Sequence, residues 1–258
     1  MAPNGYVIDL TGGCIVVTGG NRGIGLEISK AVARAGASVA IIYKASQDAE
    51  DVAAQIEERY GVKAQAYKCD VGDASLVTKT VSKIETELGP ISGLVANAGI
   101  TIQKPALELN TQDFQQIYNV NVLGVFNVAK SVAKVWIDRQ FKGGSIVVTS
   151  SMSSRIYNRK GPHDPITQVF YNSSKAAVTN LCKGLAAEWA KHSIRVNAIA
   201  PGYVDTDIVE VDPKVRQYIN DTVPVGRFAK PEEITGQTIL LLSEYASYMT
   251  GGEYLIDG

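Results

Sequence analysis

Short apolar runs alternate with longer amphipathic stretches along the whole chain. The central apolar runs are continuous, which is typical of parallel strands covered on both faces. They predict strands at residues 14–18, 38–43, 63–68, 93–96, 144–150, 195–199 and 253–256. Between them, apolar residues recur at helical spacing and predict helices at residues 25–35, 49–60, 75–88, 111–140, 171–191 and 231–242.

This alternation indicates an α/β protein with a single doubly wound Rossmann domain over residues 1–258. We expect a mostly seven-stranded parallel sheet flanked by helices, with right-handed crossovers. No internal repeat or low-complexity linker marks a domain boundary. Ligands of such sheets bind at the carboxyl ends of the strands, so the residues that follow the strands are the candidates for function.

A glycine-rich turn follows the first predicted strand and reads Thr18-Gly-Gly-Asn-Arg-Gly-Ile-Gly25. Glycines at this place let the backbone approach a pyrophosphate held at the positive end of the next helix, here through Gly19, Asn21 and Arg22. A nucleotide P-loop needs lysine after its last glycine, but Leu26 stands there. The alternative is a plain turn between strand and helix.

The end of the second predicted strand indicates which dinucleotide binds. An acidic residue there would accept hydrogen bonds from the adenosine ribose of NAD. The strand instead ends in Tyr43-Lys44, and no carboxylate follows before Asp48. Lys44 and Arg22 would neutralise a 2′-phosphate, so we expect NADP(H).

Composition and charge narrow the class of partner. With 25 Lys and Arg against 26 Asp and Glu, the net charge is −1, which argues against a nucleic-acid or anionic-membrane partner. The three cysteines are widely spaced, which suits neither a disulfide framework nor a zinc site. We expect no bound metal and, without a recognisable signal peptide, a cytoplasmic location.

Tyr171 and Lys175 stand four residues apart on a predicted helix, which places phenol and ammonium on one face. Roughly 0.7 such pairs are expected by chance, so position and neighbours must support the assignment. A cation about 4 Å from a phenolate contributes about 4 kcal/mol at an effective dielectric near 20. That equals roughly three pKa units and would bring the pKa of Tyr171 toward 7.

Taken together, these motifs resemble the short-chain dehydrogenase/reductase family. The match spans nearly the whole chain and adds Asn97-Ala-Gly99, Asn121, Ser151 and Pro201-Gly202 in the family's order. The resemblance implies that Tyr171 exchanges the proton, Ser151 holds the substrate oxygen, Lys175 binds the nicotinamide ribose and Asn121 holds a water of the proton relay.

The same resemblance implies further contacts to the cofactor. They come from Ile24, Asp70, Val71, Asn97, Lys130, Val204 and Thr206. Asp70 and Asn97 have an alternative role as helix-capping loop residues, which both residue types fill well.

Between Ser151 and Tyr171 lie more residues than the family usually has, which indicates a substrate-loop insertion at about 153–168. Ser153 and His163 are its candidate substrate residues, and its polar composition suits a hydroxyl-rich ligand. Motifs including Gln168-Val-Phe-Tyr-Asn-Ser-Ser-Lys175 resemble the fungal NADP-dependent mannitol 2-dehydrogenases, which interconvert D-fructose and D-mannitol. Sorbose reductases and arabitol dehydrogenases are similar to them.

The expected function is therefore that of an NADPH-dependent ketose reductase running reversibly as a polyol dehydrogenase. One alternative is a broad-specificity carbonyl or 3-oxoacyl reductase, and another is a non-catalytic NADP-binding sensor. Apolar stripes on the helices at 122–140 and 176–191 are typical of core packing. In the family these two helices also pair between subunits, so the resemblance implies a homotetramer.

Overall fold

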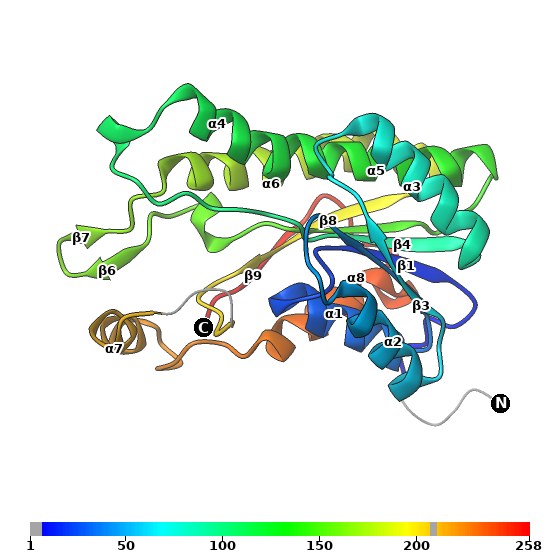
Figure 1. Cartoon of the computed structure of the whole chain (residues 1–258), viewed down its shortest axis with the longest axis horizontal. Helices are drawn as coiled ribbons and strands as arrows, with labels where there is room; N and C mark the ends of the chain where they lie inside the picture. Colours follow the sequence, from blue (N-terminus) through cyan, green and yellow to red (C-terminus); the bar gives the residue numbers. More distant parts are fainter. Residues whose placement is uncertain (1–6, 207–210) are drawn as a thin grey trace.

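The expected parallel sheet is present. A computed structural model of the chain describes residues 7–206 and 211–258. Seven strands form one parallel sheet in the order β3-β2-β1-β4-β5-β8-β9 (Figure 1). Their bounds are β1 Cys14–Thr18, β2 Ser38–Tyr43, β3 Ala64–Lys68, β4 Ile91–Ala96, β5 Ser145–Thr149, β8 Arg195–Pro201 and β9 Glu253–Ile256. Strand order reverses between β1 and β4, where such sheets bind ligands.

Helices cover both faces of this sheet (Figure 1). One face carries α3 Ala74–Glu87, α5 Val125–Asp138 and α6 Val169–Trp189, with α4 Thr111–Tyr118 packed beside α6. The other face carries α1 Gly23–Arg34, α2 Ala49–Tyr60 and α8 Thr235–Leu242. The doubly wound Rossmann fold expected from the sequence is thereby confirmed.

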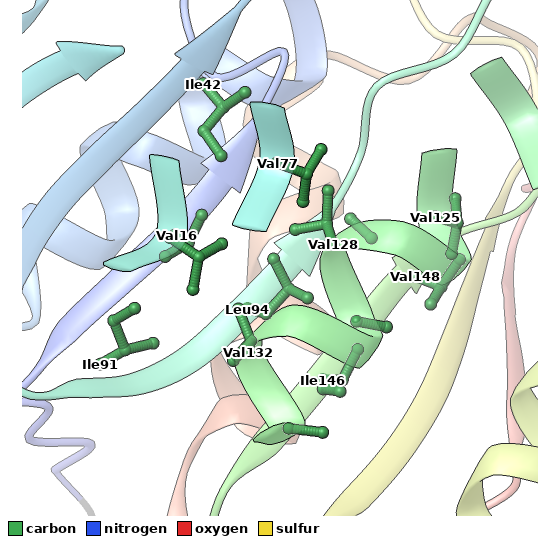
Figure 2. Close-up of a cluster of buried hydrophobic side chains, with 14 of the residues drawn as sticks. Val16, Ile42, Val77, Ile91, Leu94, Val125, Val128, Val132, Ile146 and Val148 are labelled. Carbon is green, nitrogen blue, oxygen red and sulfur yellow. The ribbon is translucent and has the colours of Figure 1, made fainter. Parts of the chain in front are cut away.

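The core explains why the central strands are apolar throughout. Alternate residues of one strand point to opposite faces, and both faces are covered. Val16, Leu94 and Ile146 point toward α5 and pack with its buried Val128 and Val132 (Figure 2). Each such side chain contributes about 1.5–3 kcal/mol on burial, so these strands form a rigid platform for the residues at their ends.

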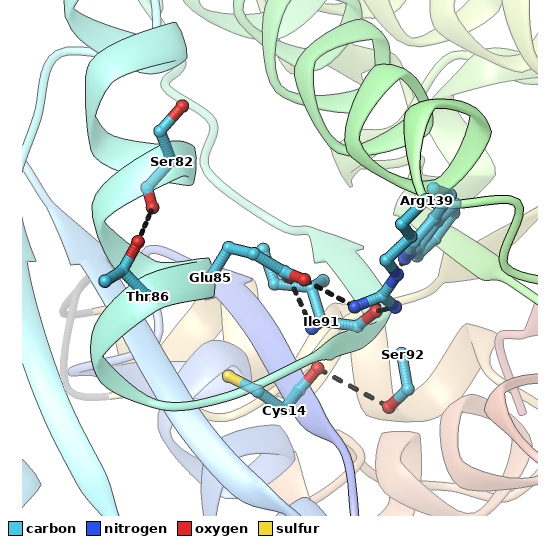
Figure 3. A network of polar contacts seen from close by, with 8 residues as sticks. Cys14, Ser82, Glu85, Thr86, Ile91, Ser92 and Arg139 are labelled. Carbon is cyan, nitrogen blue, oxygen red and sulfur yellow. Dashed lines mark hydrogen bonds and ion pairs between the residues drawn. The ribbon is translucent and has the colours of Figure 1, made fainter.

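The amino end of β4 is held by a polar cluster (Figure 3). The Glu85 carboxylate accepts a hydrogen bond from the Ile91 amide at 2.8 Å and pairs with Arg139 at 2.5 Å. Trp136 Nε1 donates to the Ile91 carbonyl at 2.7 Å, and Arg139 donates to the same oxygen. These contacts join α3 and α5 to the sheet at the end opposite the glycine turn.

The prediction of a single helix at residues 111–140 is wrong in one respect. The structure interrupts it with a π-helical turn at Asn119–Gly124, between α4 and α5. At Gly124 a Cβ would lie 2.5 Å from Val71 Cγ2, so this turn packs directly against the loop after β3. Hydrophobic periodicity does not register one wide turn, and such turns are frequent at functional sites.

The helical stretch Thr111–Asp138 is long and apolar enough to pass a length-and-composition test for a membrane span. Half of its most apolar window is buried inside the protein, as in a core helix of a globular domain. Val132 and Trp136 are fully buried against the sheet, which accounts for the apolar composition of this stretch.

Two elements beyond the predicted set lie near the carboxyl ends of the strands. The insertion forms a hairpin of β6 Arg159–Gly161 and β7 Asp164–Pro165, and α7 spans Pro213–Thr222 beside it (Figure 1). Both are too polar to show an apolar pattern. A capping signal nevertheless precedes α7, because the Asp212 carboxylate accepts hydrogen bonds from the amides of Lys214 and Val215.

Candidate active site

The glycine turn between β1 and α1 is built for close approach. Gly19 has φ +64°, a left-handed conformation that favours glycine. A Cβ on Gly25 would lie 2.1 Å from the Gly19 carbonyl oxygen, so only glycine fits there. The N-cap residue Arg22 makes no side-chain cap, which leaves the positive end of α1 available to an anion.

Asn97 joins the ends of β1 and β4 at the switch point. The Thr18 hydroxyl accepts hydrogen bonds from the amides of Asn97 and Ala98, each at 2.9 Å. Asn97 Nδ2 donates to the Thr18 carbonyl at 3.1 Å. Asn97 therefore lines the site and also links the two strand ends that form it. Thr18 was not singled out from the sequence, and its position at the end of the first strand was the available signal.

Charged groups gather where the adenosine end of a dinucleotide is expected. Lys44 Nζ lies 2.7 Å from the Asp70 carboxylate, and this hydrogen bond holds the pKa of Asp70 below its ordinary value. Asp70 also accepts a hydrogen bond from the Gly72 amide. Arg22 has no ion pair among the described residues. The pKa of Asp48 is lowered mainly by its hydrogen bond with Ser46, and the Arg22 charge adds to this effect. The Arg22 guanidinium is therefore more available to an anionic ligand than the Lys44 ammonium.

Tyr171 and Lys175 lie on the first turns of α6, as expected. Lys175 is 4% exposed, and its Nζ donates to the Thr149 carbonyl at 2.7 Å and lies 5.7 Å from the centroid of the Tyr171 ring. A Cβ on Gly99 would lie 3.4 Å from the same nitrogen, so the glycine keeps space open beside the ammonium. Gly99 and Thr149 are site residues to which the sequence analysis assigned no role of their own.

The pKa values differ from the sequence-based expectation for this pair. Burial raises the pKa of Tyr171, and its hydrogen bond with Ser151 only partly offsets that rise. Burial also lowers the pKa of Lys175 to about 8. The predicted descent of the Tyr171 pKa toward 7 is not found, because both groups are removed from water and the ammonium is bound to a backbone carbonyl. The phenol is therefore protonated at neutral pH.

Ser151 is the second residue after β5 and lines the same cavity as Tyr171 and Lys175. Its Oγ accepts a hydrogen bond from the Ser153 amide at 3.1 Å and forms a hydrogen bond with Tyr171. The neighbouring Ser150 hydroxyl is bound elsewhere, to Thr179 at 2.6 Å and the Lys175 carbonyl at 3.3 Å. This difference favours Ser151 over Ser150 as the serine that meets a substrate.

Asn121 lies in the π-helical turn and is fully buried behind the site. Its Oδ1 accepts from the Ile100 amide, and its Nδ2 donates to the Ile100 carbonyl and to Ser174 Oγ, at 2.9–3.0 Å. Ser174 Oγ in turn donates to the Tyr171 carbonyl. The Asn121 side chain thus connects the loop after β4 to the first turn of α6.

One cavity of about 1130 Å³ collects most of the predicted site. It is lined by Gly19, Asn21, Arg22, Ile24, Tyr43, Lys44, Asp70, Val71, Asn97, Ser151, Ser153, Tyr171, Lys175, Val204 and Thr206. Three predicted residues are not brought to its surface. Asn121 lies behind it, Lys130 is exposed on α5 over the Phe126 ring, and His163 is exposed on the turn of the β6–β7 hairpin.

Within the described residues, no group of three or more His, Cys, Asp or Glu is arranged to hold a metal ion. The cavity instead fits a dinucleotide. A cradle that a Cβ would fill lies at one end, and a buried tyrosine, serine and lysine lie at the other. These features define a nicotinamide-dinucleotide-dependent oxidoreductase on a Rossmann fold.

Comparison with known proteins identifies the family. Residues 19–258 match the family model described as enoyl-(acyl carrier protein) reductase. The chain belongs to the short-chain dehydrogenase/reductase family. A solved structure of a short-chain type dehydrogenase/reductase from Mycobacterium marinum is similar to it with a TM-score of 0.89 and 38% identity, covering 98% of this chain and 96% of that one.

Several curated proteins are similar over nearly the full length. A sorbose reductase of Candida albicans is 39% identical over 98% of this chain and 88% of its own. An NADP-dependent mannitol dehydrogenase of Alternaria alternata is 36% identical over 98% and 93%. A 3-oxoacyl-(acyl-carrier-protein) reductase of Aquifex aeolicus is 34% identical over 97% and 98%.

Proposed function

We propose that this protein is an NADPH-dependent ketose reductase that runs reversibly as a polyol dehydrogenase, with D-fructose and D-mannitol or a related ketose and polyol as its pair. The observation that carries this is the protonated Tyr171 phenol hydrogen-bonded to Ser151, in a cavity whose other end is the glycine turn. The names of the sorbose and mannitol relatives support the sugar class.

Residues at both ends of the cavity would hold NADP(H). The turn at Gly19 and the free end of α1 suit the pyrophosphate, Asp70 and Val71 the adenine, and Arg22 the 2′-phosphate. Asn97 and Ile24 suit the middle of the dinucleotide, and Tyr171, Lys175, Val204 and Thr206 its nicotinamide end. When bound, NADPH supplies the hydride that reduces a carbonyl carbon.

The protein's own groups then act on the carbonyl oxygen. Ser151 holds this oxygen, and the Tyr171 phenol gives it a proton as the carbon gains the hydride, so the ketone becomes a secondary alcohol. Lys175 stabilises the resulting phenolate by its charge. The Asn121 side chain donates both amide hydrogens and accepts one hydrogen bond within the protein, so we assign it the positioning of α6.

Polar side chains at the substrate end favour a hydroxyl-rich substrate. Asn158, Lys160 and Gln168 of the insertion line the cavity together with Ser153. A 3-oxoacyl reductase is the second candidate, supported by the Aquifex aeolicus relative and the description of the family model. A non-catalytic sensor is less consistent with the assembled Ser151, Tyr171 and Lys175.

We further propose a cytoplasmic homotetramer. The three free cysteines are buried and suit a reducing compartment. On α5 and α6, Val132, Trp136 and Leu185 belong to the core, as their spacing predicts. Apolar side chains that stay exposed on the layer of α4, α5 and α6 would be covered by neighbouring subunits, and they include Phe114, Leu123, Ile137 and Val169.

A screen of NADPH oxidation across D-fructose, L-sorbose, other ketoses and 3-oxoacyl thioesters tests this function, with NADH as the control cofactor. We expect the highest kcat/KM with a ketose and NADPH. A preference for the thioesters would instead support the second candidate, and no NADPH oxidation with any carbonyl would support the sensor.

A further inference from the structure

Asn158 is a buried residue whose polar atoms are not all used. It lies in the insertion and is 7% exposed. Its Nδ2 donates to Ser153 Oγ at 2.7 Å, while its Oδ1 has no hydrogen-bond partner within residues 7–206 and 211–258. Asn158 and Ser153 both line the cavity that contains Tyr171. Leaving a buried carbonyl without a hydrogen bond is unfavourable, so this atom is suited to a partner that the protein does not provide.

Ser153 has the complementary unused group. Its Oγ accepts hydrogen bonds from Asn158 Nδ2 and, at 3.5 Å, from Gln168 Nε2. Among the described residues no acceptor for the Ser153 hydroxyl hydrogen is present. The pair therefore offers one acceptor and one donor, and Ser153 stands two residues along the chain from Ser151.

Turning the Asn158 side-chain amide over does not remove the unpartnered atom. If Asn158 were turned over, Ser153 would donate to Oδ1 and the amide nitrogen would be left without its acceptor. One polar atom of Asn158 remains unpartnered either way. A sugar hydroxyl can serve in both cases, because it donates one hydrogen bond and accepts others.

We propose that Asn158, with Ser153, forms a subsite for a hydroxyl group of the substrate and determines specificity for polyhydroxylated ketones. This rests on the proposed function and deepens it by naming the residues that recognise the sugar. A methylene chain would leave both polar groups unpaired, so the subsite also discriminates against acyl substrates.

Asn158→Leu, which has a similar volume and no polar atoms, tests the subsite. The readout is kcat/KM with D-fructose and L-sorbose, compared with 2,3-butanedione, a ketone that has no hydroxyl. We expect about a tenfold or larger loss for the ketoses, as for removal of one hydrogen bond, and less than a twofold change for the dione. Ser153→Ala should give the same pattern.

Asn220→Leu is the matched control, because Asn220 also has a buried Oδ1 without a partner in the part of the chain that the structure describes, but does not line the cavity. It should leave all three substrates unchanged. If Asn158→Leu and Ser153→Ala lower ketose and dione activity equally, or affect neither, the subsite is overturned while the proposed function stands. If the unmodified enzyme reduces the dione but no ketose, the proposed function fails, and the subsite with it.

Discussion

The Lys175 ammonium lies 5.7 Å from the centroid of the Tyr171 ring and donates its hydrogen bond to the Thr149 carbonyl at 2.7 Å. Lys175 thus reaches from α6 to the end of β5 and fixes the helix that carries the tyrosine. Burial keeps the phenol protonated and favours loss of a proton from the lysine. This arrangement suits Tyr171 to donating a proton during carbonyl reduction.

Removing the Tyr171 hydroxyl should lower the rate of ketose reduction without weakening NADPH binding. We expect Tyr171→Phe to lower kcat for ketose reduction by about 10²–10⁴-fold, the usual contribution of a general acid. The dissociation constant of NADPH, measured by fluorescence titration, should change less than twofold. Tyr67→Phe is the control, because that hydroxyl binds Gln65 and Glu87 away from the cavity. Unchanged turnover in Tyr171→Phe would reject its assignment.

Lys175 should make stability depend on pH in a defined window. Its pKa is about 8 in the folded protein against an ordinary value of 10.5, so between these values the unfolded chain binds more protons. The free energy of unfolding contributed by this group therefore rises from pH 8 to 10.5, by roughly 3 kcal/mol in total. Below pH 8, Lys175 is protonated in both the folded and the unfolded chain, and burial of its charge lowers the free energy of unfolding by the full amount.

Urea unfolding of Lys175→Met against the unmodified protein, without cofactor, measures this effect. The variant should be more stable at pH 7, and the difference should shrink as pH rises to 10.5. Burial raises the pKa of Cys14 to about 12, which works in the opposite direction above pH 9. That contribution is common to both proteins and cancels. A difference in the free energy of unfolding that does not change with pH would contradict the lowered pKa of Lys175.

Cofactor selectivity should depend more on Arg22 than on Lys44. The Lys44 side chain is 66% exposed and its ammonium already pairs with Asp70, whereas Arg22 has no ion pair among the described residues. We expect Arg22→Ala to weaken NADPH binding by about 10–100-fold, as for a charged hydrogen bond, and to leave NADH unchanged. Lys44→Ala should have a smaller effect. Arg34→Ala, on the last turn of α1 outside the cavity, is the control. Equal losses for NADH and NADPH would contradict a 2′-phosphate contact.

Much of this site could be predicted because its signals are local in sequence. The glycine turn, the Tyr171–Lys175 spacing and the buried strands each occupy one short segment, and the structure places them together. The resemblance supplied the roles of Ser151 and Asn97, which follow strands and therefore reach the same edge of the sheet.

What could not be predicted depends on contacts between distant segments. In the wide turn, Asn121 forms hydrogen bonds with Ile100 and Ser174, which periodicity does not detect. The resemblance implied a cofactor contact for Lys130, and the insertion suggested His163 as a substrate residue, but both side chains are exposed and neither lines the cavity. Sequence patterns also do not reveal the contacts of the Glu253 carboxylate, because its hydrogen-bond partners lie 74 to 99 residues earlier in the chain.

Glu253 should stabilise the base of the insertion. Its side chain is 5% exposed, and its carboxylate accepts from Arg155 at 2.5 Å, Ser154 at 2.6 Å and Thr179 at 3.0 Å. Burial raises its pKa, but these three hydrogen bonds together outweigh burial and hold it below the ordinary value. The carboxylate thus joins β9 to the insertion and, through Thr179, to the helix of Lys175.

We expect Glu253→Gln to lower the free energy of unfolding by about 2 kcal/mol, since charged hydrogen bonds contribute about 1.5–3 kcal/mol each and the amide retains part of them. Glu233→Gln is the matched control, because its ion pair with Arg227 is exposed, and it should lower the free energy of unfolding by less than Glu253→Gln does. Urea unfolding at pH 7 compares the two. Because the lowered pKa makes the contribution of Glu253 fade as pH falls through that value, the gap between the variants should narrow in acid. Equal losses for both variants at pH 7 would show that the buried Glu253 carboxylate contributes no more to stability than the exposed ion pair of Glu233 with Arg227.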